Sequence, residues 1–291
     1  MSNASLAPIR LGLLLAAIGL LGGVSTALGQ AAAKPAPVPA PQPADIHARA
    51  TLRPVDSSVS DDQSVDKMLE AYAPRVRALS EVIGKLKGDL MKGGIGAGSM
   101  GNFIADAIRD RAQVKLGKPV LLAITNSGGL RKNAILEGDL KVSDIFEVLP
   151  FENALVSLDL TGEQLLRFMA IVLSNRDAQS GARIVFRLND QKVNELVSVK
   201  LRINGDEKEI DPKATYTIVT IDYLVKRGGE YSLLQEGKNM LPLSLTLRDA
   251  VIDYVRAETA AGRVIKTTLD GRFSQDKGAN AATPAGAGQR Q

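Results

Sequence analysis

An apolar run near the amino end most constrains how this chain can fold, because it assigns the first residues to export rather than to a core. Residues 1–29 combine Arg10, an apolar run over 11–24 and a small-x-small site at Ala27-Leu28-Gly29, which is the pattern of a cleaved signal peptide. The run is shorter than the ~20 residues that span a bilayer. We therefore expect a periplasmic or secreted protein without stable membrane insertion. The alternative is an uncleaved membrane anchor.

The segments that flank the central part of the chain are also unsuited to a core. Residues 30–61 begin with a stretch rich in alanine and proline, which favours extended linker conformations. Residues 274–291 are rich in glycine, alanine and glutamine and are predicted to form a disordered tail. One folded domain is therefore predicted over residues 62–273.

Inside this domain, helical and strand patterns are intermixed. Apolar residues at helical spacing predict helices over 65–79, 100–114 with Ser99 as cap, 142–149, the segment that follows Thr161 with Gln164 completing a capping box, and 247–257. Short apolar or alternating runs predict strands over 82–86, 120–125, 155–160, 183–188, 196–203 with a turn at Asn204-Gly205, and 216–221. The mixture of hairpins and helices favours an α+β class with a mixed β-sheet and packed helices.

Missing residue types exclude several kinds of chemistry. The chain has no cysteine, which excludes disulfides and a cysteine-linked lipid anchor, and its one histidine, His47, lies in the linker. A catalytic zinc or mixed two-metal site needs several histidine and carboxylate ligands, and Ser-His-Asp or Cys-His catalysis needs a histidine base. Ser64 and Lys67 match S-x-x-K, but the partner motifs S-D-N and K-T-G are absent, so we interpret Ser64 as a helix cap.

The charge pattern argues against nucleic-acid binding. The formal net charge is only +4, and no basic run is interleaved with aromatic residues. A site for Mg²⁺ made only of carboxylates stays open, although no D-x-D cluster marks one. Paired carboxylates of the glycosidase type cannot be picked out among 32 acidic residues.

Three loops carry the residues that could hold a small ligand. The segment 126–131 follows a predicted strand and brings Asn126, two glycines that allow close backbone approach, and the planar cation Arg131. The second loop is 150–153, and the third comprises Tyr223 and the turn 228–231. Two rings from separate loops could sandwich a purine or pyrimidine. For each loop alone, a plain turn or a packed ring is the alternative.

Six segments in order resemble the C-terminal domain of the 5'-nucleotidase family. They are GNFIADA at 101–107, which is similar to the family's G-N-L-x-x-D-A, NSGGLR at 126–131, GDL to EVLPF across 138–151, LTGEQL at 160–165, the V-x-V-N-G-like segment at 199–205, and IDP to Thr220 across 210–220. Each segment alone is loose, whereas six in the family's order are specific. The resemblance covers nearly the whole predicted domain.

The resemblance implies a site for a nucleotide or nucleoside. Asn126 and Arg131 would contact base and ribose, Phe151 and Tyr223 would stack on the base, and Asn153 would hydrogen-bond it. Glu230 stands where the family usually has an aspartate for the ribose hydroxyls. Gly128 and Gly129 complete the candidate set of substrate-binding residues.

The resemblance also marks two departures from the family pattern. The family's G-G-D-G turn is altered at 228–231, and the region 93–100 lacks the arginine that often precedes the G-N-L helix. In the family, a separate N-terminal metallophosphoesterase domain holds two metals and cleaves the phosphate. The segment before residue 62 is too short for such a domain, so we expect no cofactor and no catalytic residue here, and divalent metals only in a partner subunit.

Three functions remain open at this stage. The first is a recognition module that takes part in nucleotide hydrolysis with a separately encoded metallophosphoesterase. The second is a stand-alone periplasmic nucleoside-binding protein. The third is a structural or interaction domain with a degenerate pocket, since a fold alone does not specify a function. Whether the chain is itself part of an enzyme stays undecided.

Overall fold

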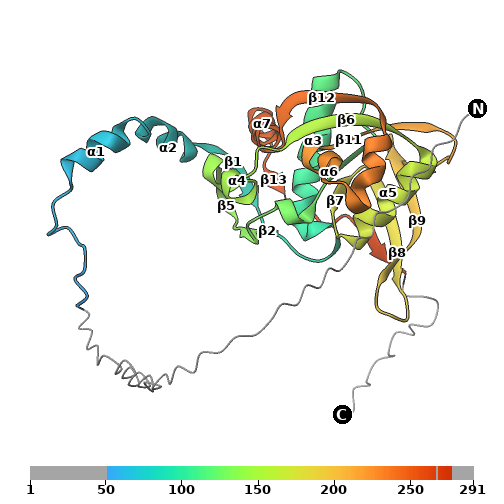
Figure 1. Ribbon diagram of the computed structural model, residues 1–291, viewed down its shortest axis with the longest axis horizontal. Helices are drawn as coiled ribbons and strands as arrows, with labels where there is room; N and C mark the ends of the chain where they lie inside the picture. Colours follow the sequence, from blue (N-terminus) through green and yellow to red (C-terminus); the bar gives the residue numbers. More distant parts are fainter. Residues whose placement is uncertain (1–50, 267, 277–291) are drawn as a thin grey trace, which may run out of the picture. The chain divides into compact units, whose positions relative to one another are not determined.

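The computed structural model describes residues 51–266 and 268–276 (Figure 1). The chain divides into two compact units, Met1–Val59 and Ser60–Gln291. The described part of the first unit contains no helix or strand. The predicted export signal and nearly all of the predicted tail lie outside the described residues. Within the described ranges, no helix is both long and apolar enough to cross a membrane.

The predicted helix over 65–79 is two helices, α1 (Gln63–Glu70) and α2 (Ala73–Leu79). Pro74 lies in the first turn of α2, where it is tolerated but would break a continuous helix. The cap of α1 is Asp62, not Ser64. Its carboxylate accepts hydrogen bonds from the Ser64 N–H at 2.8 Å and the Ser64 hydroxyl at 2.6 Å.

A five-stranded mixed sheet forms the centre of the domain and confirms the predicted fold class. Its strands, in spatial order, are β12 (Lys238–Thr246), β6 (Ala154–Thr161), β11 (Thr215–Ile221), β3 (Leu122–Thr125) and β7 (Ala178–Ser180). β11 and β3 are parallel, and the other three pairs are antiparallel. Strand β3 is buried throughout, because helices and neighbouring strands cover it.

The register of this sheet brings one end of every strand to the same edge. Ile221, the last residue of β11, is opposite Leu155 near the start of β6. Thr246 at the end of β12 is opposite Ala154, and Thr125 at the end of β3 is opposite Ala178 at the start of β7. The segments that follow β3, β11 and β12, and those that precede β6 and β7, therefore meet along one edge.

Helices α3 (Gly98–Leu116), α5 (Gly162–Ser174) and α7 (Leu247–Ala260) pack on the sheet (Figure 1). The predicted capping box of α5 is confirmed, since Thr161 Oγ1 accepts from the Gln164 N–H at 3.2 Å and Gln164 Oε1 accepts from the Thr161 N–H at 2.9 Å. The predicted cap of α3 is wrong. Ser99 lies inside the helix, where its hydroxyl accepts the Met91 N–H at 2.9 Å.

Smaller sheets complete the domain. The first contains, in spatial order, β10 (Asp206–Glu209), β9 (Asn194–Ile203), β8 (Ala182–Leu188) and β14 (Phe273–Gln275). The second contains β13 (Ile265–Lys266), β1 (Val82–Lys87) and β5 (Gly138–Lys141). The third pairs β2 (Leu90–Met91) with β4 (Ala134–Ile135). The predicted hairpin turn at Asn204-Gly205 joins β9 and β10, as expected. Short helices are η1 (Ile95–Ala97), η2 (Ser127–Gly129), α4 (Val142–Val148), α6 (Asp222–Arg227) and η3 (Gly229–Glu236).

The carboxyl end of the domain extends two residues past its predicted limit, because β14 runs to Gln275. The buried Arg272 guanidinium anchors this strand, since Nη1 donates to Asp106 at 2.9 Å and to the Gln179 carbonyl at 3.0 Å, and Nε donates to Asp270 at 2.9 Å. Burial raises the pKa of Asp270, but Arg272 and a hydrogen bond from Arg202 outweigh it and hold the pKa at about 2.

A buried polar network joins the start of β7 to η3. Asp177 Oδ1 accepts the Ser127 N–H at 2.9 Å, and Asp177 Oδ2 accepts the Tyr231 hydroxyl at 2.5 Å. Asn175 Nδ2 in turn donates to the Tyr231 hydroxyl at 2.8 Å. Burial raises the pKa of Asp177 from its ordinary value of 3.8 to about 6, although the hydrogen bonds from Tyr231 and Ser127 oppose this rise.

Gly101 in α3 gives a direct test of packing at the start of this helix. A Cβ at Gly101 would lie 1.9 Å from the Gly96 carbonyl oxygen, so the backbone must shift to admit it. We expect Gly101→Ala to lower the free energy of unfolding by roughly 1–3 kcal/mol, measured by urea denaturation. Gly93→Ala is the control, because its Cβ would meet nothing within 4 Å. Equal stability of both variants would contradict this packing.

Asp177 gives a pH-dependent prediction. Because its pKa is raised in the folded state, the proton is held more tightly there than in the unfolded chain. The resulting stabilisation is complete below about pH 3.8 and is lost as the pH rises through about 6. The unfolding free energy of the wild type minus that of Asp177→Asn should therefore be larger at pH 4 than at pH 7, in urea titrations at each pH. A pH-independent difference would refute the assignment.

Candidate ligand-binding site

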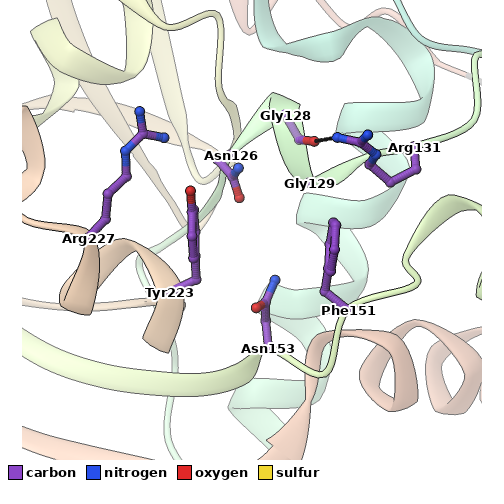
Figure 2. Close-up of a pocket in the computed structure, with 8 residues that line it drawn as sticks. All are labelled: Asn126, Gly128, Gly129, Arg131, Phe151, Asn153, Tyr223 and Arg227. Atoms are coloured by element: carbon purple, nitrogen blue, oxygen red, sulfur yellow. Dashed lines mark hydrogen bonds between the residues drawn. The ribbon is translucent and has the colours of Figure 1, made fainter.

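A pocket of about 260 Å³ opens at the edge where the ends of the five strands meet (Figure 2). Its lining residues come from three segments that are distant in the sequence, namely the segment after β3, the loop before β6 and helix α6. They are Asn126, Gly128, Gly129, Arg131, Phe151, Asn153, Tyr223 and Arg227. Seven of these, all but Arg227, were expected from the sequence to bind the ligand, and the structure brings those seven together around one hollow.

Two aromatic rings face each other across this pocket. Phe151 lies in the loop between α4 and β6, and Tyr223 lies in the first turn of α6, directly after β11. The exposed fraction is 47% for Phe151 and 43% for Tyr223, so neither ring is used to fill the core. Figure 2 shows a gap between the two rings. Such a gap admits a flat ring, because aromatic faces gain energy by stacking.

Two amides supply polar groups at this gap. Asn126 directly follows β3 and is only 7% exposed, and within the described part of the chain its Oδ1 accepts no hydrogen bond. A buried acceptor without a partner costs free energy, so it is a natural contact for a ligand donor. Asn153 lies at the other end of the gap in Figure 2. An amide can donate and accept at once, as the edge of a nucleobase requires.

The glycines of η2 leave room for Asn126. A Cβ at Gly129 would lie 3.1 Å from Asn126 Oδ1, and a Cβ at Gly128 would lie 3.5 Å from Asn126 Nδ2. The end of this loop is fixed by the Arg131 N–H, which donates to the Val148 carbonyl at 2.8 Å. Gly129 therefore allows the loop to pass close to the asparagine side chain, whereas a Cβ at Gly128 would make only ordinary contact.

A guanidinium accompanies each ring. Arg131 lies 5.8 Å from the centroid of Phe151, and Arg227 lies 6.0 Å from the centroid of Tyr223. Both distances are within the range of cation–π attraction. Arg227 was not among the expected residues. A helix prediction over this segment could have found it, because residues four apart on a helix share a face and Tyr223 lies in the first turn of α6.

Glu230 differs from the expectation, because it does not line the pocket. Gly228 and Gly229, directly before Glu230, both have positive φ, at 68° and 60°, and lie at the start of η3. Its carboxylate instead lies 3.8 Å from Arg227 Nη2. Arg227 therefore lines the pocket, whereas Glu230 does not.

A buried arginine holds the loop that carries Phe151. Arg248 follows β12 at the start of α7, and its Nη1 donates to the Leu149 and Pro150 carbonyls at 3.3 and 3.4 Å. Its Nη2 donates to Glu152 at 2.6 Å. These contacts fix the loop on both sides of the ring, so the ring can stay exposed without a disordered backbone.

A second hollow is less suited to a ligand. The hollow between α3 and α7 measures about 540 Å³. Charged side chains in its lining already pair with neighbours, Glu258 with Arg263 and Asp106 with Arg272. Among the described residues, no group of three or more His, Cys, Asp or Glu side chains is placed to hold a metal ion. His47, which the sequence places in the linker, lies outside the described residues.

Comparison with known proteins agrees with the geometry. Residues 82–236 match the family described as 5'-nucleotidase, C-terminal domain. The trifunctional nucleotide phosphoesterase protein YfkN of Bacillus subtilis is 33% identical over 149 residues, which cover 48% of this chain and 10% of that protein. Protein UshA of Escherichia coli is 25% identical over 185 residues, which cover 60% of this chain and 31% of UshA.

Solved structures show the same fold. A 5'-nucleotidase precursor from Thermus thermophilus superposes with a TM-score of 0.62 at 26% identity, over 74% of this chain and 43% of the other. The NAD nucleotidase of Haemophilus influenzae gives a TM-score of 0.56 at 20% identity, which concerns the fold alone. The chain thus matches less than half the length of these relatives. Because the family match covers more than half of the chain, the chain belongs to the 5'-nucleotidase family through its C-terminal domain.

Proposed function

We propose that this domain recognises a nucleotide or nucleoside by holding the base between Phe151 and Tyr223. The observation that carries the proposal is the pair of half-exposed rings that face one another across the pocket. The buried, unpartnered Oδ1 of Asn126 supplies a contact for a donor on the ligand. The relatives are named as nucleotidases or nucleotide phosphoesterases, which supports this class of ligand.

We further propose that the domain takes part in nucleotide hydrolysis outside the cytoplasm, together with a separately encoded metallophosphoesterase. The pattern of residues 1–29 supports export. The family match concerns its C-terminal domain, and we place the divalent metals in the partner. The partner's metals would supply the hydrolytic chemistry, and this chain would bind and orient the nucleoside.

An exposed apolar surface supports association with a partner. Five side chains of α1, α2 and the turn between them recur at helical spacing and are all exposed by 43% or more: Val65, Met68, Leu69, Tyr72 and Val76. Exposed apolar side chains gathered on two short consecutive helices favour a contact with another protein. We assign this face to the metallophosphoesterase, since α1 and α2 lie at the amino end of the nucleoside-binding unit.

Replacing the two rings tests recognition. A stacked base gains ~1–3 kcal/mol per aromatic ring, so Phe151→Ala and Tyr223→Ala should each raise the Kd for adenosine about five- to a hundredfold in calorimetry. The unfolding free energy should stay within about 0.5 kcal/mol, because both rings are half-exposed. Tyr72→Ala is the matched control, since this exposed tyrosine lies outside the pocket. Unchanged Kd values in both ring variants would eliminate the proposal.

Mixing experiments test the partner. The purified chain should raise the rate of AMP hydrolysis by a metallophosphoesterase of the same organism, and the two proteins should comigrate in size-exclusion chromatography. Met68→Glu and Leu69→Glu should abolish both effects, because a charge at a buried apolar contact is costly. Val114→Glu is the control, since Val114 is 66% exposed on another helix, α3. No comigration and no rate increase would remove the partner from the proposal.

A further inference from the structure

Arg227 is the one pocket residue that the family pattern did not lead us to expect. It ends α6, one helical turn after Tyr223. Its guanidinium lies 6.0 Å from the Tyr223 ring centroid and 5.4 Å from that of Tyr231. The Tyr231 hydroxyl in turn donates a hydrogen bond to Oδ2 of the buried Asp177 at 2.5 Å. The guanidinium is therefore kept near the pocket by two rings, one of which is firmly fixed.

The donors of Arg227 are free for a ligand. Within the described part of the chain, its guanidinium donates no hydrogen bond, and its ion pair with Glu230 is long at 3.8 Å. Both side chains of that pair are about half exposed, at 46% and 45%, so solvent screens the attraction. The other arginine that supports the pocket, Arg248, by contrast donates from Nη1 to two carbonyls and from Nη2 to a carboxylate.

The charges around the pocket favour an anion. Its eight lining residues include Arg131 and Arg227 and no carboxylate. Figure 2 shows Asn153 at one end of the gap between the rings, with the two guanidinium groups toward the other end and on opposite sides. A base whose edge reaches Asn153 would therefore direct its substituent toward the two cations. Guanidinium groups bind phosphate through two parallel hydrogen bonds.

We infer that Arg227 is a specificity-determining residue that makes the pocket prefer phosphorylated over unphosphorylated nucleosides, by hydrogen-bonding the ligand's phosphate. The inference rests on the proposed recognition of nucleosides and adds the charge of the preferred ligand. It assigns stacking to Phe151 and Tyr223, and discrimination between nucleotide and nucleoside to the cation. The phosphate contact also predicts that salt weakens binding of the nucleotide more than binding of the nucleoside.

Calorimetry of the full chain with AMP and with adenosine tests this inference. The wild type should bind AMP about tenfold or more tightly than adenosine, because a charge-assisted hydrogen bond contributes this much. Arg227→Gln should lower the ratio of the two Kd values markedly toward one, although Arg131 remains in the lining, while the Kd for adenosine stays within about twofold. Arg227→Lys should keep much of the ratio. Arg167→Gln is the control, since this exposed arginine on α5 lies outside the pocket.

The possible outcomes distinguish the role of Arg227 from the proposed recognition of nucleosides. A collapsed ratio in Arg227→Gln alone supports the role of Arg227. An unchanged ratio, or an equal loss of AMP and adenosine binding as expected from a merely structural arginine, overturns that role and leaves nucleoside recognition intact. If the wild type binds neither AMP nor adenosine, both the inference and the proposed recognition fail.

Discussion

The pairing of β3 with β11 is the constraint on which the site depends. These two strands are parallel, so their carboxyl ends lie at one edge, and antiparallel neighbours bring the starts of β6 and β7 to the same edge. Asn126 follows one strand, Tyr223 follows another, and Asn153 precedes a third. A shift of one residue in this register would turn each strand's side chains to the opposite face and separate the three loops.

Buried polar contacts then allow the pocket to stay open. Asp177 ties the Ser127 loop to Tyr231, and Arg248 ties the backbone around Phe151 to α7. Because these anchors are shielded from water, their hydrogen bonds are electrostatically stronger than those of exposed groups. Phe151 and Tyr223 can therefore remain half-exposed while the loops that carry them are held in place. The pocket combines a fixed frame with free aromatic faces, which is the arrangement that a binding site requires.

Much of this structure could be predicted from the sequence, and the exceptions have physical causes. Long apolar patterns predicted β6, β8, β9, β11 and α7, because their own side chains carry the signal. The two-residue strands β2, β4 and β13 could not be predicted, since they exist only through pairing with distant partners. Ser99 has the residue type of a cap, but the nearby β2 backbone competes for its hydroxyl. Seven pocket residues were found by family order. Arg227 was not expected and Glu230 is absent from the lining, because the positions of α6 and η3 at the strand edge depend on tertiary packing and not on a local pattern.

The central claim is that a flat heterocycle occupies the gap between Phe151 and Tyr223. A crystal structure of the protein with adenosine bound tests it most directly. The account predicts density for the base between the two rings, with its edge within hydrogen-bonding distance of the Asn153 or Asn126 side chain. A base bound elsewhere, or two rings that close upon each other and leave no space, would contradict the account.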